Sequence, residues 1–201
     1  MKNQYHYIID QSGSMSDCQR ATIEGINVQI NSLRKLAVEE KELSFKASVH
    51  FFNDNVKTIS KEQLPMNLRN LTPEDYSPNG NTSLYDAIGC IGSAERLMSA
   101  ADVKQGKKKV VFVILTDGYE NSSKLFTFES VRKLISEMQE EGYVFLFLGA
   151  IIDAKQVAEK MNIKKENAHS FSKDQMKGTF SKMSSSLEDL AKKKSNWNKF
   201  N

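Results

Sequence analysis

Six consecutive apolar residues, Val110 to Leu115, constrain the fold of this 201-residue chain more than any other segment. The run is far shorter than the roughly 20 residues of a membrane span, and its valine and isoleucine content favours a strand. A strand that is apolar at every position is buried on both faces, which is typical of the centre of a parallel sheet. We therefore expect an α/β protein with this strand in the middle.

Segments with strand and helix periodicity alternate along the chain. Asn53-Asp54-Asn55 has strong turn chemistry, so the strand after it should return antiparallel to the strand before it. This order predicts a doubly wound, mostly parallel sheet of about six strands with one antiparallel edge strand and helices on both faces, a Rossmann-like arrangement. The expected strands are 5–9, 45–52, 56–59, 110–115, 143–148 and 168–171, and the expected helices are 16–37, 84–98, 131–138, 153–161 and 173–194.

The length predicts a single domain over residues 1–201, ending in a basic amphipathic helix, 173–194, and a short tail, 195–201. Residues 60–81 hold all three prolines and are expected to form a long irregular connection. Trp197 in the tail either docks on the domain or contacts a partner.

The amino-terminal residues Met1 to Tyr7 lack the apolar core and cleavage site of a signal peptide, so a cytoplasmic location is expected. The two cysteines, Cys18 and Cys90, give no disulfide framework and are expected to be buried thiols. Three histidines, His6, His50 and His169, fall in different strands without ligand spacing, which favours core or surface roles over a zinc site.

Positive charge gathers at the end of the chain. Residues 155–201 contain 11 lysines and 5 acidic residues, a net charge of +6, which leaves −3 for residues 1–154. Nucleic-acid binding through this segment is one alternative, but neither an arginine cluster nor interleaved aromatic residues support it. Lysines on a solvated helix face are the simpler explanation.

Polar side chains follow two of the expected strands and precede one helix. The three segments are Asp10 to Ser14, Asn79 to Ser83, and Leu115 to Gly118. In an open α/β sheet, ligands bind beyond the carboxyl ends of the strands, where successive connections diverge to opposite faces. Hydroxyl and carboxylate oxygens suit a hard divalent cation. Taken singly, each segment has a plain alternative, because Ser14, Ser16 and Thr82 could cap helices and Asp117-Gly118 could form an ordinary turn.

Taken together, the three segments resemble the metal-ion-dependent adhesion site of von Willebrand factor A domains. The matching positions are Asp10, Ser12 and Ser14 for Asp-x-Ser-x-Ser, Thr82 before the second long helix, and Asp117 with Gly118 after the central strand. The resemblance covers residues 5 to about 190 and implies an octahedral Mg²⁺ or Mn²⁺. It also implies that the three hydroxyls bind the ion directly and that the two carboxylates bind partly through water.

The same resemblance implies a binding module without catalytic residues. Neutral hydroxyl ligands leave the cation electron-poor, so an Asp or Glu of a protein partner can complete its shell. In this family Thr82 and Asp117 would exchange direct and water-mediated coordination, a change that could reach the closing helix. The compact chain suggests a stand-alone bacterial or phage type, and family analogy suggests an ATPase or stress-response complex as partner.

An enzyme of the haloacid-dehalogenase phosphatase type is the remaining alternative, because such enzymes also carry an aspartate after the first strand. Their chemistry uses Asp-x-Asp, in which the second carboxylate is the general acid and base. Ser12 occupies that second position here and is a poor proton donor. Glu120 and Asn121 lie just beyond Asp117, where they could select partners or be ordinary loop residues.

Overall fold

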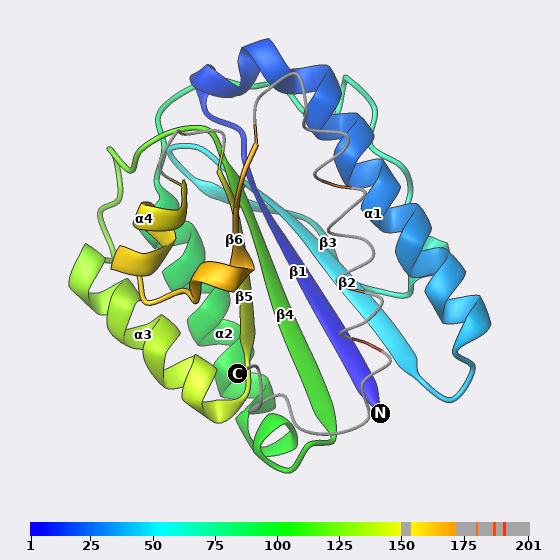
Figure 1. The fold of residues 1–201 in the computed structure, drawn as a ribbon. Coiled ribbons are helices and arrows are strands. Elements are labelled where there is room, and N and C mark those ends of the chain that lie inside the picture. Colours follow the sequence, from blue (N-terminus) through cyan, green and yellow to red (C-terminus); the bar gives the residue numbers. More distant parts are fainter. Residues whose placement is uncertain (150–153, 172–179, 181–186, 188–190, 192–201) are drawn as a thin grey trace.

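The computed structural model describes residues 1–149 and 154–171 together with positions 180, 187 and 191. Its strands form one six-stranded sheet in the order β3-β2-β1-β4-β5-β6, in which only β3 is antiparallel to its neighbour (Figure 1). The strands are β1 Lys2–Asp10, β2 Ser44–Phe52, β3 Val56–Gln63, β4 Lys108–Thr116, β5 Val144–Gly149 and β6 Ala168–Ser170. The helices are α1 Gln19–Glu39, α2 Leu84–Lys104, α3 Phe128–Glu141 and α4 Ala154–Lys160, with short 3₁₀ turns η1 Gly13–Cys18, η2 Pro65–Asn67 and η3 Lys165–Asn167. The predicted fold class is confirmed.

The alternating side chains of the central strands build a separate core on each face of the sheet. Tyr7 and Val113 pack in the core beneath α1, whereas Ile8 and Phe112 pack in the core beneath α2, α3 and α4. Figure 1 shows α1 on one side of the sheet and the other three helices on the opposite side. Each large apolar side chain buried in this way contributes roughly 1.5–3 kcal/mol. Strands β1 and β4 are thereby fixed at the middle of the molecule.

Only three positions of the expected closing helix are described, and all three are helical and buried in the α1-side core: Phe180, Leu187 and Ala191. The Phe180 ring lies directly over Gly25 of α1, where a Cβ would be 2.1 Å from a ring carbon. Gln29, one turn further along α1, donates a 2.7 Å hydrogen bond from Nε2 to the Phe180 carbonyl oxygen. The rest of the expected helix 173–194, the tail 195–201 and Trp197 lie outside the described residues.

Several expected boundaries were wrong by a few residues: α2 ends at Lys104 instead of 98, and β1 begins at Lys2 instead of 5. Two others have a visible structural cause. Strand β3 continues to Gln63 instead of ending at 59, because β2 is long enough to pair with its whole length. The pairing contains two register shifts, and next to them the Glu62 N–H donates to Ser48 Oγ at 2.9 Å. Helix α1 begins at Gln19 instead of 16, because residues 13–18 form a 3₁₀ turn in which Ser16 Oγ donates to the Gly13 carbonyl oxygen.

The connection between β3 and α2 is irregular, as expected, and α1 holds it in place. Gln19 Nε2 donates to the Tyr76 carbonyl oxygen, and Asn27 exchanges two hydrogen bonds with the backbone of Leu71. Arg34 donates to the carbonyl oxygens of η2 and of the residue after it. These three α1 residues are seven or eight positions apart, so they share one helix face. The connection therefore reaches α2 along a fixed path.

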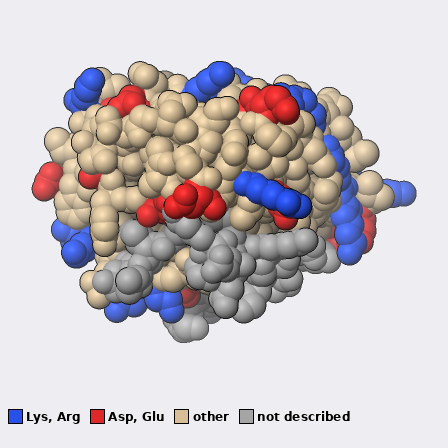
Figure 2. All heavy atoms as spheres, turned by 90° about the horizontal axis from the view of Figure 1, so that it is seen from above, with Lys and Arg blue, Asp and Glu red and all other residues tan. Residues whose placement is uncertain are grey.

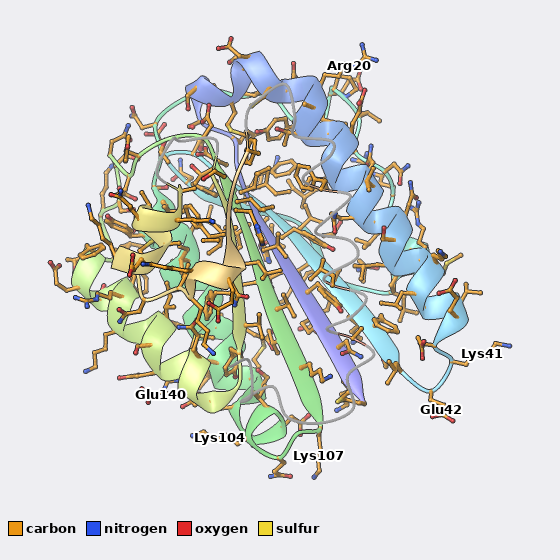
Figure 3. All side chains as sticks on the ribbon, in the orientation of Figure 1. Arg20, Lys41, Glu42, Lys104, Lys107 and Glu140 are labelled. Carbon is orange, nitrogen blue, oxygen red and sulfur yellow. The ribbon has the colours of Figure 1, made fainter. Side chains whose placement is uncertain are left out.

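The carboxyl ends of the parallel strands meet at one edge of the sheet. Figure 3 shows Arg20, at the start of α1, on this edge, and Lys104 and Lys107 at the opposite edge. None of the helices in the described part of the chain has the length and apolarity of a membrane span.

Candidate metal centre

Asp10, the last residue of β1, is fully buried and held by hydrogen bonds to both of its carboxylate oxygens. Oδ1 accepts from the backbone N–H of Ser12 at 2.7 Å, and Oδ2 accepts from Thr116 Oγ1 of β4 at 2.5 Å. Burial raises the pKa of Asp10, while the hydrogen bonds from Thr116 and Ser12 act in the opposite direction. The carboxylate is therefore positioned by neighbouring central strands before any ligand binds.

The hydroxyls of the first turn connect this carboxylate to the loop after β4. Ser12 Oγ and Ser14 Oγ are 3.1 Å apart, and Ser14 Oγ donates to Asp117 Oδ1 at 2.6 Å. Gly118 lies against the same group, since a Cβ at that position would be 3.3 Å from Thr82 Oγ1 and 3.4 Å from Ser14 Oγ. The structure thus brings the five predicted residues together at the edge where β1 and β4 end.

Backbone hydrogen bonds fix how the three segments meet. Gly13 N–H donates to the Gly80 carbonyl oxygen at 3.0 Å, and Asn79 N–H donates to the Gln11 carbonyl oxygen at 2.9 Å. The Tyr76 hydroxyl donates to the Asp10 carbonyl oxygen. The long connection therefore packs on the first turn and presents Thr82 to it.

The hydroxyls do not act as the helix caps that offered the simpler explanation. The N-cap of α1 is Cys18, which makes no capping hydrogen bond through its side chain, while Ser14 Oγ donates to Asp117 and Ser16 Oγ donates to the Gly13 carbonyl oxygen; Ser12, at the N-cap of η1, makes no capping hydrogen bond either. Ser83, not Thr82, occupies the N-cap position of α2, and its hydroxyl donates to the Asn53 carbonyl oxygen and makes no capping hydrogen bond. Helix capping therefore does not account for Ser12, Ser14 and Thr82 at this edge.

Glu120 and Asn121, which sequence reasoning left open, have a structural role. Glu120 accepts hydrogen bonds from the backbone N–H groups of Tyr85, Ser122 and Ser123, at 2.7–2.9 Å. Asn121 pairs with the backbone of Thr82 through both its side chain and its own N–H. These contacts join the β4–α3 loop to the start of α2.

Asp86, in the first turn of α2, is a positioning residue that sequence reasoning missed. Its carboxylate accepts from the backbone N–H groups of three consecutive residues, Lys124, Leu125 and Phe126, at 2.8–2.9 Å. An acidic residue in the first turn of a helix was the available signal, but nothing in the sequence indicates which loop it binds.

The arrangement fits a small divalent cation. Oxygens bound at about 2.1 Å in octahedral geometry lie about 3 Å from their neighbours, close to the 3.1 Å between Ser12 Oγ and Ser14 Oγ. The donors are all oxygens, as hard cations prefer. Among the described residues, no three His, Cys, Asp or Glu side chains form a group that could hold a metal, so this mixed hydroxyl and carboxylate cluster has no competitor of that type.

His6 and His50 form a buried cluster elsewhere, on the α2 face of the sheet. His6 Nδ1 lies 3.2 Å from His50 Nε2, and His6 Nε2 lies 3.1 Å from Glu95 Oε2. Lys108 Nζ donates to the other oxygen of Glu95 at 2.6 Å, and His50 Nδ1 contacts the Thr58 hydroxyl at 3.0 Å. Core or surface roles were expected for the histidines; His6 and His50 are buried, but their mutual contact was not predicted. Cys18 is buried, whereas Cys90 is only partly buried.

Fold and site place the chain among doubly wound α/β proteins that gather polar side chains where the central strands end. Within that class the chain belongs to the von Willebrand factor type A domain family, whose family model matches residues 7–192. The resemblance drawn from the three sequence segments is confirmed. Domains of this family are generally protein-interaction modules.

Three solved structures share this fold at low sequence identity. Proximal thread matrix protein 1 from the mussel byssus, with zinc in its metal-ion-dependent adhesion site, has a TM-score of 0.64 and 15% identity over 90% of this chain and 46% of its own. Manganese-loaded Plasmodium vivax TRAP has a TM-score of 0.59 and 14% identity over 88% of this chain and 71% of its own.

A von Willebrand factor type A protein from Catenulispora acidiphila has a TM-score of 0.59 and 17% identity, with 91% of this chain and 42% of that one covered. The chain therefore spans about half the length of the mussel and Catenulispora proteins. No curated protein matches the chain in sequence.

Proposed function

We propose that this domain binds a protein partner through a divalent cation, Mg²⁺ or Mn²⁺. The observation that carries the proposal is the chain of oxygens from Ser12 through Ser14 to Asp117, with Thr82 against Gly118. These residues, with Asp10 beneath them, would hold the ion. When bound, the cation supplies a strong electrostatic attraction for a carboxylate, so the partner presents an Asp or Glu.

Two features favour binding over catalysis. Asp10 is fully buried beneath the hydroxyls and is held by Ser12 and Thr116, which leaves this carboxylate poorly placed to attack a phosphate. The position two residues later, where a phosphatase of the alternative type needs an acid, is Ser12. A cytoplasmic setting and a partner from an ATPase or stress-response complex remain predictions. Nucleic-acid binding gains no support, because the lysine-rich segment lies mostly outside the described residues.

Calorimetric titration of the full chain with MgCl₂ and MnCl₂ tests the metal site. Ser12→Ala and Thr82→Ala should each weaken binding at least tenfold, because each removes one hydroxyl ligand. Ser16→Ala is the matched control, since this hydroxyl lies in the same turn but donates to the Gly13 carbonyl oxygen. Equal affinities in the wild type and both ligand variants would refute the proposed site.

A further inference from the structure

A fourth segment reaches the edge that holds the candidate metal site, namely the turn between β2 and β3. Both neighbours of Thr82 are bound to this turn. Asn81 donates from its backbone N–H to Asp54 Oδ2 at 3.2 Å and from Nδ2 to Asp54 Oδ1 at 2.8 Å. Ser83 donates from its backbone N–H to the Asn53 carbonyl oxygen at 2.9 Å, and its hydroxyl donates to the same oxygen. Thr82 is therefore held from both sides by a turn that supplies none of the five candidate ligands.

The side chain of Asp54 is not needed to close its own turn. Asn53 closes the turn, because its N–H donates to the Asn55 carbonyl oxygen at 3.1 Å and its Oδ1 accepts from the Asn55 N–H at 3.2 Å. The Asp54 carboxylate instead accepts the two hydrogen bonds from Asn81, which lies 27 positions further along the chain. Asp54 is exposed, so these bonds rather than burial place its side chain. The carboxylate thus acts on the loop before α2 and not on the hairpin.

Gly80 allows this carboxylate to approach the loop closely. A Cβ at Gly80 would be 2.2 Å from Asp54 Oδ2, and its φ of +73° lies in the left-handed region that favours glycine. The carbonyl oxygen of Gly80 accepts from the N–H of Gly13, in the middle of the first turn, at 3.0 Å. Gly80 therefore contacts both Asp54 and the first turn. A displacement of the loop at Asp54 would move Thr82 relative to the serine hydroxyls.

We propose that Asp54 is a positioning residue for the candidate metal site. Its carboxylate holds Gly80 and Asn81 so that the Thr82 hydroxyl and the hydroxyls of the first turn stay within reach of one cation. Asp54 itself does not bind the ion. Residues that hold metal ligands in place typically change the metal affinity about 10–100-fold when they are removed. This inference rests on the proposed function and identifies a residue outside the ligand set that controls the affinity of the site.

The charge of Asp54 offers a second way to raise the affinity for a cation. Figure 2 looks down on this edge of the sheet and shows charged side chains dispersed over a largely uncharged surface. Charges that are exposed to solvent attract each other weakly, and salt screens them. Positioning needs a hydrogen-bond acceptor at residue 54, whereas attraction needs the charge. In Asp54→Asn the amide oxygen can still accept from the Asn81 N–H, and the Asn81 amide can turn its oxygen towards the new amide group.

Calorimetric titration of the full chain with MnCl₂, paired with urea denaturation in a chelator, tests the inference. Asp54→Ala should lower the Mn²⁺ affinity about tenfold, because Asn81 loses both acceptors. Asp54→Asn should keep an affinity close to that of the wild type. Asn55→Ala is the matched control, since Asn55 joins the same turn through its backbone N–H and carbonyl groups. The urea midpoint without metal should change little in all three variants, because the turn closes without the Asp54 side chain.

Three outcomes would overturn the inference and leave the proposed function standing. One is wild-type affinity in Asp54→Ala. Another is an equal loss in Asp54→Asn and Asp54→Ala, which would assign the effect to charge. The third is a loss in Asp54→Ala that comes with a large fall of the urea midpoint without metal, which would mark a general structural role. A wild-type chain that does not bind Mn²⁺ would overturn the proposed function and this inference with it.

Discussion

Ser14 Oγ donates a 2.6 Å hydrogen bond to Asp117 Oδ1 across 103 positions of the sequence. The contact joins the turn after β1 to the loop after β4, and these two strands are neighbours at the centre of the sheet. The hydroxyl donates only its hydrogen, so the lone pairs of Ser14 Oγ remain available to a cation while the hydrogen bond holds the two loops together. Metal binding and the relative position of the two loops are therefore coupled.

Metal binding should stabilise the folded protein. At a free Mg²⁺ or Mn²⁺ concentration 100 times the Kd, the free energy of unfolding rises by about 2.7 kcal/mol. For a domain of this size we expect a Tm increase of about 5–10 °C. Scanning calorimetry with and without a chelator measures it. The increase should disappear in Ser14→Ala and persist in Ser16→Ala, and a full shift in Ser14→Ala would contradict the site.

Gly118→Val should weaken metal binding without unfolding the protein. The Cβ that this substitution adds would lie 3.3 Å from Thr82 Oγ1 and 3.4 Å from Ser14 Oγ, and its methyl groups would crowd both hydroxyls. We expect at least a tenfold loss of Mn²⁺ affinity by calorimetric titration. Gly92→Ala, whose Cβ would meet side chains of α3 and not the site, should retain the wild-type affinity.

Gly25→Ala should destabilise the protein through the contact with Phe180. The new methyl group would be 2.1 Å from the ring, and the ring is almost completely buried, so it cannot move without disturbing the core. Overpacking of this kind costs about 1–3 kcal/mol, measurable by urea denaturation. The combination Gly25→Ala/Phe180→Leu should cost less than the sum of its single changes. Strict additivity would show that the two positions are not in contact.

Acid should destabilise the protein through His50. Burial lowers the pKa of His50 to about 3 from 6.5, and nearby His6 and Lys61 act in the same direction. Between these values the unfolded chain binds a proton that the folded protein excludes, so the free energy of unfolding falls as the pH falls from 6.5 towards 3. The slope from this one group reaches about 1.4 kcal/mol per pH unit.

Denaturant titrations at several pH values should give a shallower slope for His50→Gln than for the wild type over that window. Glu95 should add a second fall in the free energy of unfolding, at pH values below the ordinary pKa of a glutamate. Burial raises the pKa of Glu95, but hydrogen bonds from His6 and Lys108 outweigh burial and bring the pKa to about 2. Parallel pH profiles for the wild type and His50→Gln would show that His50 is protonated when folded.

The central strands were predictable because the pattern of apolar residues in their sequences matches the burial of those residues in the structure. The apolar run from Val110 is β4, and the turn residues Asn53 to Asn55 do join two antiparallel strands. The same reasoning predicted that Asp10, Thr82 and Asp117 lie together at one edge of the sheet, because the carboxyl ends of parallel strands meet there. Whether these residues bind a metal stays a prediction.

The supporting contacts were not predictable, because they are made by irregular backbone and by residues far apart in sequence. Asp86 and Glu120 bind N–H groups of a loop without periodicity. His6 meets Glu95, 89 positions away, and that pairing depends on how α2 lies across the sheet. Patterns in a sequence report which face of an element is buried, but they do not report which polar groups meet there.

Long irregular connections are usually where a protein accepts inserted residues or a cut in its chain. The connection between β3 and α2 should tolerate neither. Gln19, Asn27 and Arg34 hold its backbone at three levels of α1, and its last residues set the position of Thr82. An extra residue between Leu71 and Tyr76 would shift one attachment relative to the next. Engineered fusions or permuted termini are better placed at the turn between α1 and β2, where Lys41 and Glu42 are exposed and lie far from the edge that holds the candidate metal site (Figure 3).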